Sequence, residues 1–205
     1  MKHINHLFLY ALVATCCMIE GVLTLSDFAV VAPGHLRNAF YFNGAFWPGL
    51  LGNWKANYAW QPYLMFFTHG FLHTGFTHLA VNMIALGALG PAVTRHVGQG
   101  RLILLFVFSV LGGGAGFALL ADNLSPMVGA SGGLFGLLGA LLAWEIRDSQ
   151  EERAALWALI RDVAVLLVLS LISWAAMGGH LAWQAHLGGL VTGCIAATFF
   201  RRNAP

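Results

Sequence analysis

A serine and a histidine that each head an apolar run are the residues of this sequence whose types could do chemistry together. Ser131 is the one hydroxyl side chain in PMVGASGGLFGLLGALLAW, residues 126–144, and His186 lies near the start of WQAHLGGLVTGCIAA. A serine becomes an effective nucleophile when an adjacent base takes its proton. If folding brings the two side chains together, the serine could act as a covalent nucleophile and the histidine as its base.

Further polar side chains lie in the segment FTHGFLHTGFTHLAVNM, which carries His69, His73, His78 and Asn82. His78 and Asn82 are four residues apart, so a helix would place them on one face. Nine residues separate His69 from His78, which is about half a turn out of phase on a regular helix. We therefore expect two different roles, with His69 and His73 as structural hydrogen-bonding groups at the mouth of the helix.

The elements that position these side chains follow from a composition with 59% hydrophobic and 9% charged residues and a mean hydropathy of +0.74. A bilayer core of about 30 Å needs ~20 apolar residues per helix. Six such stretches occur, near residues 7–29, 63–91, 101–121, 127–144, 156–177 and 181–200. Because lipid offers no partner to open backbone groups, the sequence predicts an all-α, polytopic membrane protein of six helices, with residues 1–205 as one domain.

Positive charge predicts the orientation of these helices, since cytoplasmic loops carry an excess of Lys and Arg. Of the ten such residues, eight fall on one side of the predicted membrane: Lys2, Arg95, Arg101, Arg147, Arg153, Arg161, Arg201 and Arg202. Only Arg37 and Lys55 lie in the opposite loops. Both termini are therefore expected in the cytoplasm, and the heads of the fourth and sixth helices outside. The net charge of +2 gives no indication of nucleic-acid binding.

Small residues on the fourth and sixth predicted helices could let them approach closely. The sixth has Gly189 and Gly193 at small-xxx-small spacing, with Gly188 beside them. The fourth has matching residues at Gly132, Gly136, Gly139 and Ala140. Such surfaces allow helix backbones to pack tightly in a membrane. This packing would bring the head with Ser131 near the head with His186.

The connection between the first two predicted helices, about residues 32–61, is long and contains Trp47, Trp54 and Trp60. Tryptophan favours the membrane interface, where an apolar ring meets a wet edge. We expect this loop in the outer leaflet. Glu20 and Asp27, toward the outer end of the first helix, are expected to be polar anchors.

Each polar residue also has a structural explanation when it is considered alone. Ser131 could be a helix cap, His186 a satisfied interhelical hydrogen bond, and Asn82 a contact between helices. That account explains less well why three helices would place a nucleophile, a base and further donors at compatible depth.

Three motifs resemble the rhomboid family of intramembrane serine proteases: HLAVN in the second predicted helix, GASG in the fourth and AHLGG in the sixth. The resemblance extends from about His69 to the end of the chain. It implies that Ser131 is the nucleophile and His186 the general base, as a dyad without an acid. His78 and Asn82 match positions that assist the oxyanion, together with the backbone N–H of Ser131.

The same resemblance implies supporting roles for Gly129, Gly132 and Phe135, with no metal and no cofactor. The implied substrates are transmembrane segments of other proteins in the lipid bilayer. The implied location is the plasma (inner) membrane, with the active site open to the outside. One departure concerns the first loop, because Leu64 and Met65 stand where many members have a Trp-Arg pair.

Two alternatives come from other classes of protein. A catalytically inactive rhomboid-like protein that binds membrane clients would share the fold, but such proteins commonly lack the serine or the histidine. A metal-dependent membrane enzyme or transporter could use the membrane-region histidines. The sequence contains no HExxH motif and no acidic residue placed near His78 to complete such a site.

Overall fold

The computed structural model describes residues 6–31, 34–148 and 181–200, together with isolated positions between 157 and 175. The α-helices with defined bounds are α1 (Leu7–Asp27), α2 (Leu36–Gly44), α3 (Gln61–Thr68), α4 (Phe76–Val97), α5 (Gln99–Leu120), α6 (Ser131–Asp148) and α8 (Trp183–Phe199). Two short 3-10 helices, η1 (Pro48–Leu51) and η2 (His69–Phe71), lie between them. This part of the chain is all-helical, as predicted, and has no strand beyond one isolated bridge.

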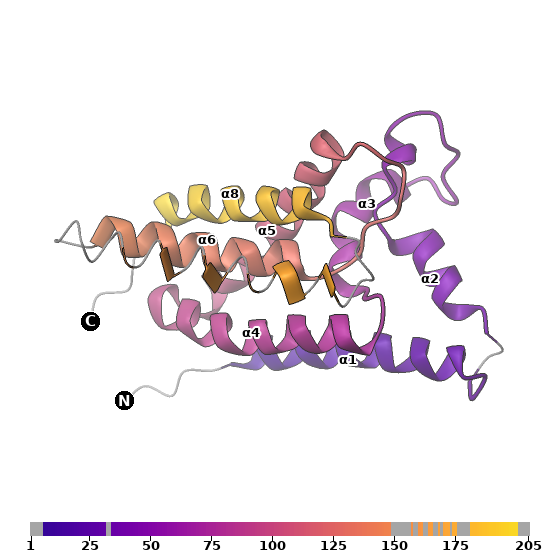
Figure 1. The fold of residues 1–205 in the computed structure, drawn as a ribbon, viewed down its shortest axis with the longest axis horizontal. Helices are drawn as coiled ribbons and strands as arrows, with labels where there is room; N and C mark the ends of the chain where they lie inside the picture. The colour runs from indigo at the N-terminus through magenta and orange to yellow at the C-terminus, as the bar shows by residue number, and fades with distance from the viewer. Residues whose placement is uncertain are drawn as a thin grey trace.

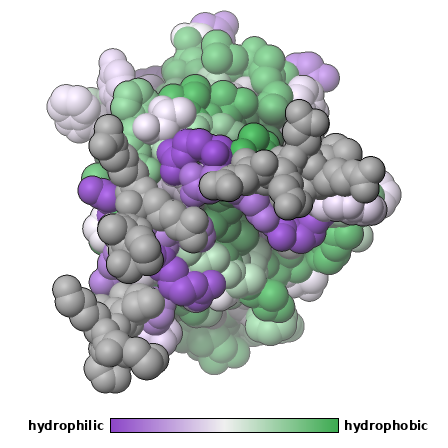
Figure 2. Space-filling view, turned by 90° about the vertical axis from the view of Figure 1, so that its left-hand side faces the viewer, coloured by the Kyte–Doolittle hydropathy of each residue, from purple (hydrophilic) through white to green (hydrophobic). Residues whose placement is uncertain are grey.

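The long helices form a bundle in which α1, α4, α6 and α8 run side by side (Figure 1). The first turns of α6 and α8 lie at the end of the bundle where α2 and α3 are found. The opposite end is shown in Figure 2, where hydrophilic residues gather on the end face and hydrophobic residues surround them. The basic side chains in the last turns of α4 and α6 include Arg95 and Arg147.

Three of the described helices, α1, α4 and α5, are long and apolar enough to cross a membrane, with mean hydropathies of 1.9, 1.5 and 2.3. Their outward faces carry exposed apolar side chains such as Met18, Ile84 and Phe108. A helix that is apolar all round suits a lipid environment. The predicted spans near residues 7–29 and 101–121 are therefore confirmed as apolar helices.

The second predicted span, residues 63–91, is wrong as a single helix. The chain forms α3 and η2, leaves helical structure over residues 72–75, and begins α4 at Phe76. Gly75 precedes α4 with φ of 146°, a conformation that is open to glycine and strained for other residues. The half-turn phase difference predicted between His69 and His78 does not apply, because no continuous helix joins them.

The fourth and sixth predicted spans correspond to α6 and α8, with one change at the start of α6. Residues 127–130 are not helical, and Met127 instead exchanges two backbone hydrogen bonds of 2.9 Å with Phe46. This bridge ties the loop after α2 to the segment that leads into Ser131. The fifth predicted span, residues 156–177, falls where only isolated positions are described, so the count of six helices stays a prediction.

Glycines set the distance between α6 and α8, as the small-residue pattern predicted. A Cβ atom built on Gly189 would collide with the carbonyl oxygen of Gly132, and one on Gly193 with that of Gly136. Further along the helices, Trp144 donates from Nε1 to the Ala197 carbonyl at 3.1 Å. The two backbones therefore touch along several turns, with no room for a side chain between them.

A third helix shares this close packing. A Cβ on Gly116 of α5 would approach the backbone of Gly188 to 2.8 Å, and a Cβ on Gly113 would approach Gly132 Cα to 3.2 Å. The run GGGAG at residues 112–116 is the sequence feature that allows this approach of α5. It was not among the small residues used to predict the contact between the fourth and sixth helices.

We predict that Gly193→Ala destabilises the protein, because the added methyl group has to displace the α6 backbone. Overpacking of this kind costs about 1 to 3 kcal/mol. Gly87→Ala on α4 is the matched control, since a Cβ there meets nothing within 4 Å. The unfolding midpoint in detergent should fall for Gly193→Ala and stay level or rise for Gly87→Ala. Equal midpoints for the two variants would contradict the packing described here.

Candidate active site

The first turns of α6 and α8 bring a serine hydroxyl and an imidazole into contact. Ser131 is the first residue of α6 and His186 the fourth of α8, and the distance from Ser131 Oγ to His186 Nε2 is 2.9 Å. The glycine contacts between the two helices place them close enough for this bond. His186 is only 6% exposed, so the pair sits inside the bundle.

The other ring nitrogen of His186, Nδ1, has no hydrogen-bond partner among the described residues. For Nε2 to accept the serine proton, the neutral ring must carry its own proton on Nδ1. No carboxylate in this part of the chain orients that N–H. The geometry is therefore that of a two-residue pair.

The ring of Phe135 lies parallel to the imidazole of His186. The ring centroids are 4.1 Å apart and the planes differ by 11°. Phe135 is one turn along α6 from Ser131, so the same helix supplies the hydroxyl and the surface against which the histidine stacks. Rotation of the imidazole would have to break this stacking contact.

The ring of His78 lies next to Gly129, two residues before Ser131. A Cβ built on Gly129 would lie 3.0 Å from His78 Nε2 and 3.7 Å from Ser131 Oγ. Gly129 also has φ of 132°, where other residues are strained. Glycine is therefore favoured at position 129 both by the backbone conformation and by the close approach of the His78 ring.

Asn82 is buried on α4, one turn beyond His78. Its Nδ2 donates to the carbonyl of His78 at 2.8 Å, so the amide is bonded to its own helix. An amide nitrogen carries two hydrogens, and this bond uses one of them. The structure thus brings together five of the predicted site residues: Ser131, His186, His78, Gly129 and Phe135. Asn82 lies one turn further along α4 than His78.

His69 and His73 are fully buried rather than placed at an open mouth. The carbonyl group of each residue accepts hydrogen bonds. His69 accepts from the Gly129 N–H at 2.9 Å, and its ring meets Phe46 edge-on with centroids 6.1 Å apart. The ring nitrogens of both residues have no hydrogen-bond partner among the described residues, so their structural hydrogen-bonding role stays a prediction.

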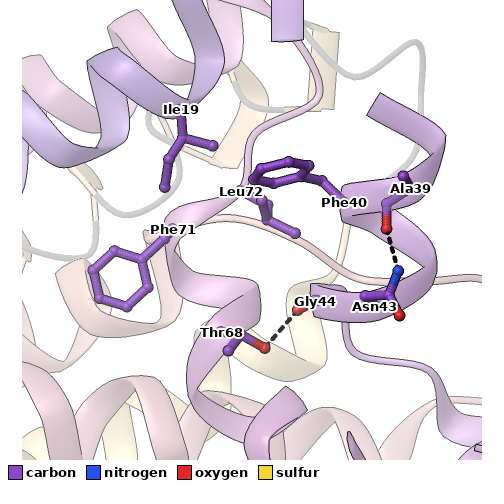
Figure 3. Close-up of a pocket in the computed structure, with 8 residues that line it drawn as sticks. All are labelled: Ile19, Ala39, Phe40, Asn43, Gly44, Thr68, Phe71 and Leu72. Carbon is purple, nitrogen blue, oxygen red and sulfur yellow. Dashed lines mark hydrogen bonds between the residues drawn. The ribbon is translucent and has the colours of Figure 1, made fainter. Parts of the chain in front are cut away.

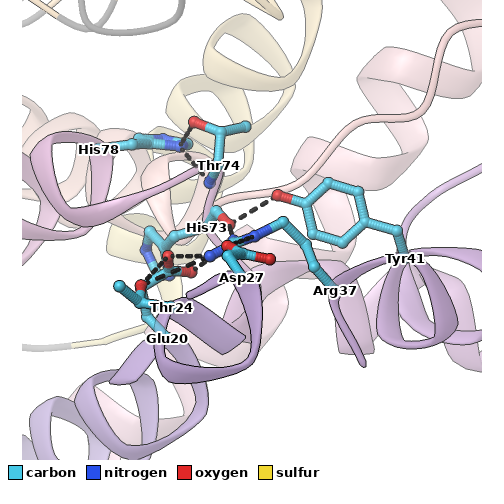
Figure 4. Close-up of polar contacts among 8 residues, drawn as sticks. All are labelled: Glu20, Thr24, Asp27, Arg37, Tyr41, His73, Thr74 and His78. Atoms are coloured by element: carbon cyan, nitrogen blue, oxygen red, sulfur yellow. Dashed lines mark hydrogen bonds and ion pairs between the residues drawn. The ribbon is translucent and has the colours of Figure 1, made fainter. Parts of the chain in front are cut away.

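Figure 4 shows a polar cluster beside this site that the sequence analysis did not assemble. Arg37 of α2 pairs with Glu20 of α1 at 2.8 Å and with Asp27 at 2.7 Å. Burial alone lowers the pKa of Arg37, but its hydrogen bonds with the two carboxylates outweigh burial and raise it. The signals were present in the sequence: a lone arginine in the outer loop and two acids on the first helix.

Between α1, α2 and the α3–η2 region lies an apolar pocket of about 470 Å³ (Figure 3). It is lined by Ile19, Ala39, Phe40, Asn43, Gly44, Thr68, Phe71 and Leu72. Its two polar side chains are occupied, since Asn43 donates to the Ala39 carbonyl and Thr68 to the Gly44 carbonyl, each at 2.7 Å. With no titratable side chain in its lining, this pocket offers no acid or base.

A smaller and more polar pocket of about 260 Å³ lies beside the segments that lead into the serine and the histidine. Met127 and Gln184 line it, along with Asp122, Asn123 and Ser125. Among the described residues, no group of three or more His, Cys, Asp or Glu side chains could hold a metal ion.

A helical membrane protein with a serine hydroxyl and an imidazole paired inside its bundle is the class that this fold and site define. The Rhomboid domain matches residues 58–203, so the chain belongs to the rhomboid family, as its motifs predicted.

Several characterised relatives are similar to this chain. Rhomboid protease GluP of Bacillus subtilis is 33% identical over 126 residues, which are 62% of this chain and 24% of the relative. RHOMBOID-like protein 1 of Arabidopsis thaliana is 34% identical over 65% of this chain and 33% of its own length. Rhomboid protease GlpG of Salmonella paratyphi A is 30% identical over 68% of this chain and 49% of its own length. The similarity thus spans less than half of each of these relatives.

The stacked ring of Phe135 leads to a prediction about turnover. If it holds His186 and stabilises the imidazolium by a cation–π contribution of ~0.5 to 2 kcal/mol, Phe135→Ala should lower turnover by about 2- to 30-fold. Phe135→Tyr keeps the ring and should retain most activity. Turnover per serine titrated by a fluorophosphonate corrects for unequal folding. An unchanged rate in Phe135→Ala would show that the ring only fills space.

Proposed function

We propose that this chain is an intramembrane serine endopeptidase that cleaves transmembrane segments of other membrane proteins. The observation that carries the proposal is the 2.9 Å contact between Ser131 Oγ and His186 Nε2 inside a helical bundle. Membership of the rhomboid family supports it, because relatives such as GluP and GlpG are named rhomboid proteases.

The proposed reaction is acyl transfer through the dyad. Ser131 Oγ attacks the peptide carbonyl while His186 Nε2 takes the hydroxyl proton, and the carbonyl electron pair moves onto oxygen. As the intermediate collapses, His186 gives the proton to the leaving amine and the peptide C–N bond breaks. Water then attacks the acyl-enzyme with the same base, which releases the carboxylate and restores the serine.

The oxyanion in this proposal is stabilised by donors that converge on the serine. The N–H of Ser131 belongs to the first turn of α6, where backbone N–H groups lack intrahelical partners and the helix dipole is positive. The second candidate donor is His78 Nε2, which lies beside Gly129. Asn82 is the third candidate, through the amide hydrogen that its bond to His78 leaves over.

The proposed topology has six membrane helices, both termini in the cytoplasm, and the site opening outside in the plasma membrane. Hydrolysis needs water inside an apolar bundle. The polar pocket lined by Asp122, Asn123, Ser125 and Gln184 is the route that we assign to it, since it adjoins the segments before Ser131 and His186. The substrate segment has to unwind locally, because an intact helix hides its carbonyl groups.

The alternative function is that of a rhomboid-like protein that binds membrane clients without cutting them. It would need the same bundle, but it would not need an activated hydroxyl. The hydrogen bond of His186 to Ser131 and its stacking on Phe135 favour the protease over the client-binding alternative.

We predict that the purified protein is labelled covalently by a fluorophosphonate, because the imidazole activates the serine. Ser131→Ala and His186→Ala should both abolish labelling, and chelators should have no effect. Wild type should also cleave a reporter that carries a transmembrane segment, and Ser131→Ala should not. Labelling of Ser131→Ala at the wild-type level would refute the proposal. Binding of the reporter without cleavage or labelling would favour the client-binding alternative.

The topology gives a separate prediction. Cysteines introduced at Asn57 and Asn123 should react with an impermeant thiol reagent in intact cells, because both belong to loops assigned to the outside. A cysteine at Gly100, in the first turn of α5, should react only after lysis; a Cβ there meets nothing within 4 Å, so the substitution is tolerated. The unsubstituted protein measures the background from Cys16, Cys17 and Cys194. The reverse pattern would overturn the assigned orientation.

A further inference from the structure

One peptide group, between His73 and Thr74, is hydrogen-bonded at both ends in a way that connects the Arg37 cluster to His78. Its carbonyl oxygen accepts from Tyr41 OH at 2.6 Å and from Arg37 Nη1 at 3.1 Å. Its N–H, on Thr74, points at His78 Nδ1 at 3.4 Å. Because a trans peptide is planar with C=O and N–H opposed, fixing the carbonyl also fixes the direction of the N–H.

The carbonyl is held firmly because Arg37 is itself anchored. Arg37 makes two hydrogen bonds to the Glu20 carboxylate, at 2.8 and 3.1 Å, and a third to Asp27 at 2.7 Å. Glu20 is 2% exposed, so this pair is largely removed from water, where charge-assisted bonds are strong and directional. Burial also raises the pKa of Tyr41, which keeps its hydroxyl protonated as a donor to the peptide.

The donor at Nδ1 determines which nitrogen of His78 carries the proton. A backbone N–H can only donate, so Nδ1 has to accept, and a neutral imidazole with an accepting Nδ1 carries its hydrogen on Nε2. The hydroxyl of Thr74 lies 3.2 Å from the same Nδ1 and can donate to it as well. Nε2 is one of the two ring atoms nearest Gly129: a Cβ built there would lie 3.0 Å from it and 3.7 Å from Ser131 Oγ. Figure 4 shows this connection from Glu20 to His78.

We propose that Arg37 and Tyr41 are positioning residues that act through the His73–Thr74 peptide to hold His78 in the tautomer with a proton on Nε2, ready to donate to the oxyanion. This inference rests on the proposed function for its catalytic consequence, although the tautomer itself does not depend on turnover. Donors that bind the carbonyl also polarise the peptide group and make its N–H a stronger hydrogen-bond donor. This adds to the preference of His78 for the tautomer with its proton on Nε2.

Tyr41→Phe tests the inference, since it removes the 2.6 Å bond and keeps the ring. Tyr58→Phe is the matched control. Tyr58 lies in the same connection between α1 and α3, and the variant loses a 2.8 Å bond to the carbonyl of Asn43, not one to the carbonyl of His73. NMR of the ring nitrogens, in protein that contains nitrogen-isotope-labelled histidine, reports the tautomer of each ring. The signal of His78 is identified because it disappears in His78→Ala. We expect Nε2–H for His78 in wild type and Tyr58→Phe, and a mixture of tautomers in Tyr41→Phe.

A second variant removes the whole anchor without leaving a buried charge unpaired. The combination Glu20→Gln, Arg37→Met and Tyr41→Phe replaces the ion pair by neutral side chains of similar size. Loss of one oxyanion donor costs ~10²-fold in turnover, and kcat scales with the fraction of His78 that carries Nε2–H. A loss of about nine tenths of that tautomer in this variant should therefore lower kcat about tenfold, with KM unchanged. Labelling of Ser131 by fluorophosphonate should persist, because the dyad is untouched.

An unchanged His78 tautomer in the triple variant would overturn the inference, whatever the turnover. A changed tautomer with unchanged kcat would uphold the positioning role and remove His78 from the oxyanion site. If wild type neither labels nor cleaves, the proposed function fails, and the NMR comparison still decides the tautomer question by itself.

Discussion

Contact between glycines on α6 and α8 is the constraint on which the site depends. Gly132 and Gly136 leave their carbonyl oxygens against Gly189 and Gly193, with no space for a Cβ atom between the helices. Only at this separation can a short serine side chain reach an imidazole on the neighbouring helix. Packing in lipid depends on close backbone approach rather than on burial of apolar surface from water, so a single methyl group has a large effect.

The second half of the site comes from the region before α4, where regular structure stops. Leaving helical structure at residues 72–75 frees the His73–Thr74 peptide to be bonded from α2 on one side and to face His78 on the other. The bridge between Phe46 and Met127 joins the same outer region to the approach to Ser131. Helix starts and loops at one end of the bundle therefore assemble the polar groups, and the apolar helices beneath them supply the frame.

Sequence patterns predicted the long apolar helices but not the break before α4. The apolar runs around α1, α5, α6 and α8 were visible because lipid requires long apolar helices, and the spacing of small residues indicated the α6–α8 contact. The span predicted for residues 63–91 was wrong because the polar residues His73 and Thr74 lie at a break between helices, not in the interior of one helix. Hydropathy does not register a backbone conformation that depends on one glycine and on the contacts around it.

Apolar length and short motifs are local properties of the chain, so the amino-acid sequence alone predicted an all-helical membrane protein of the rhomboid family and singled out Ser131 and His186 as candidate site residues. Only the tertiary structure decided that Ser131 Oγ lies 2.9 Å from His186 Nε2, that Phe135 stacks on that ring, and that Asn82 is bonded to its own helix. It also decided that Glu20, Arg37 and Tyr41 converge on one peptide group beside His78. These contacts join residues up to 55 positions apart, and hydrogen bonds at such separations depend on helix packing distances and backbone directions that no local pattern encodes.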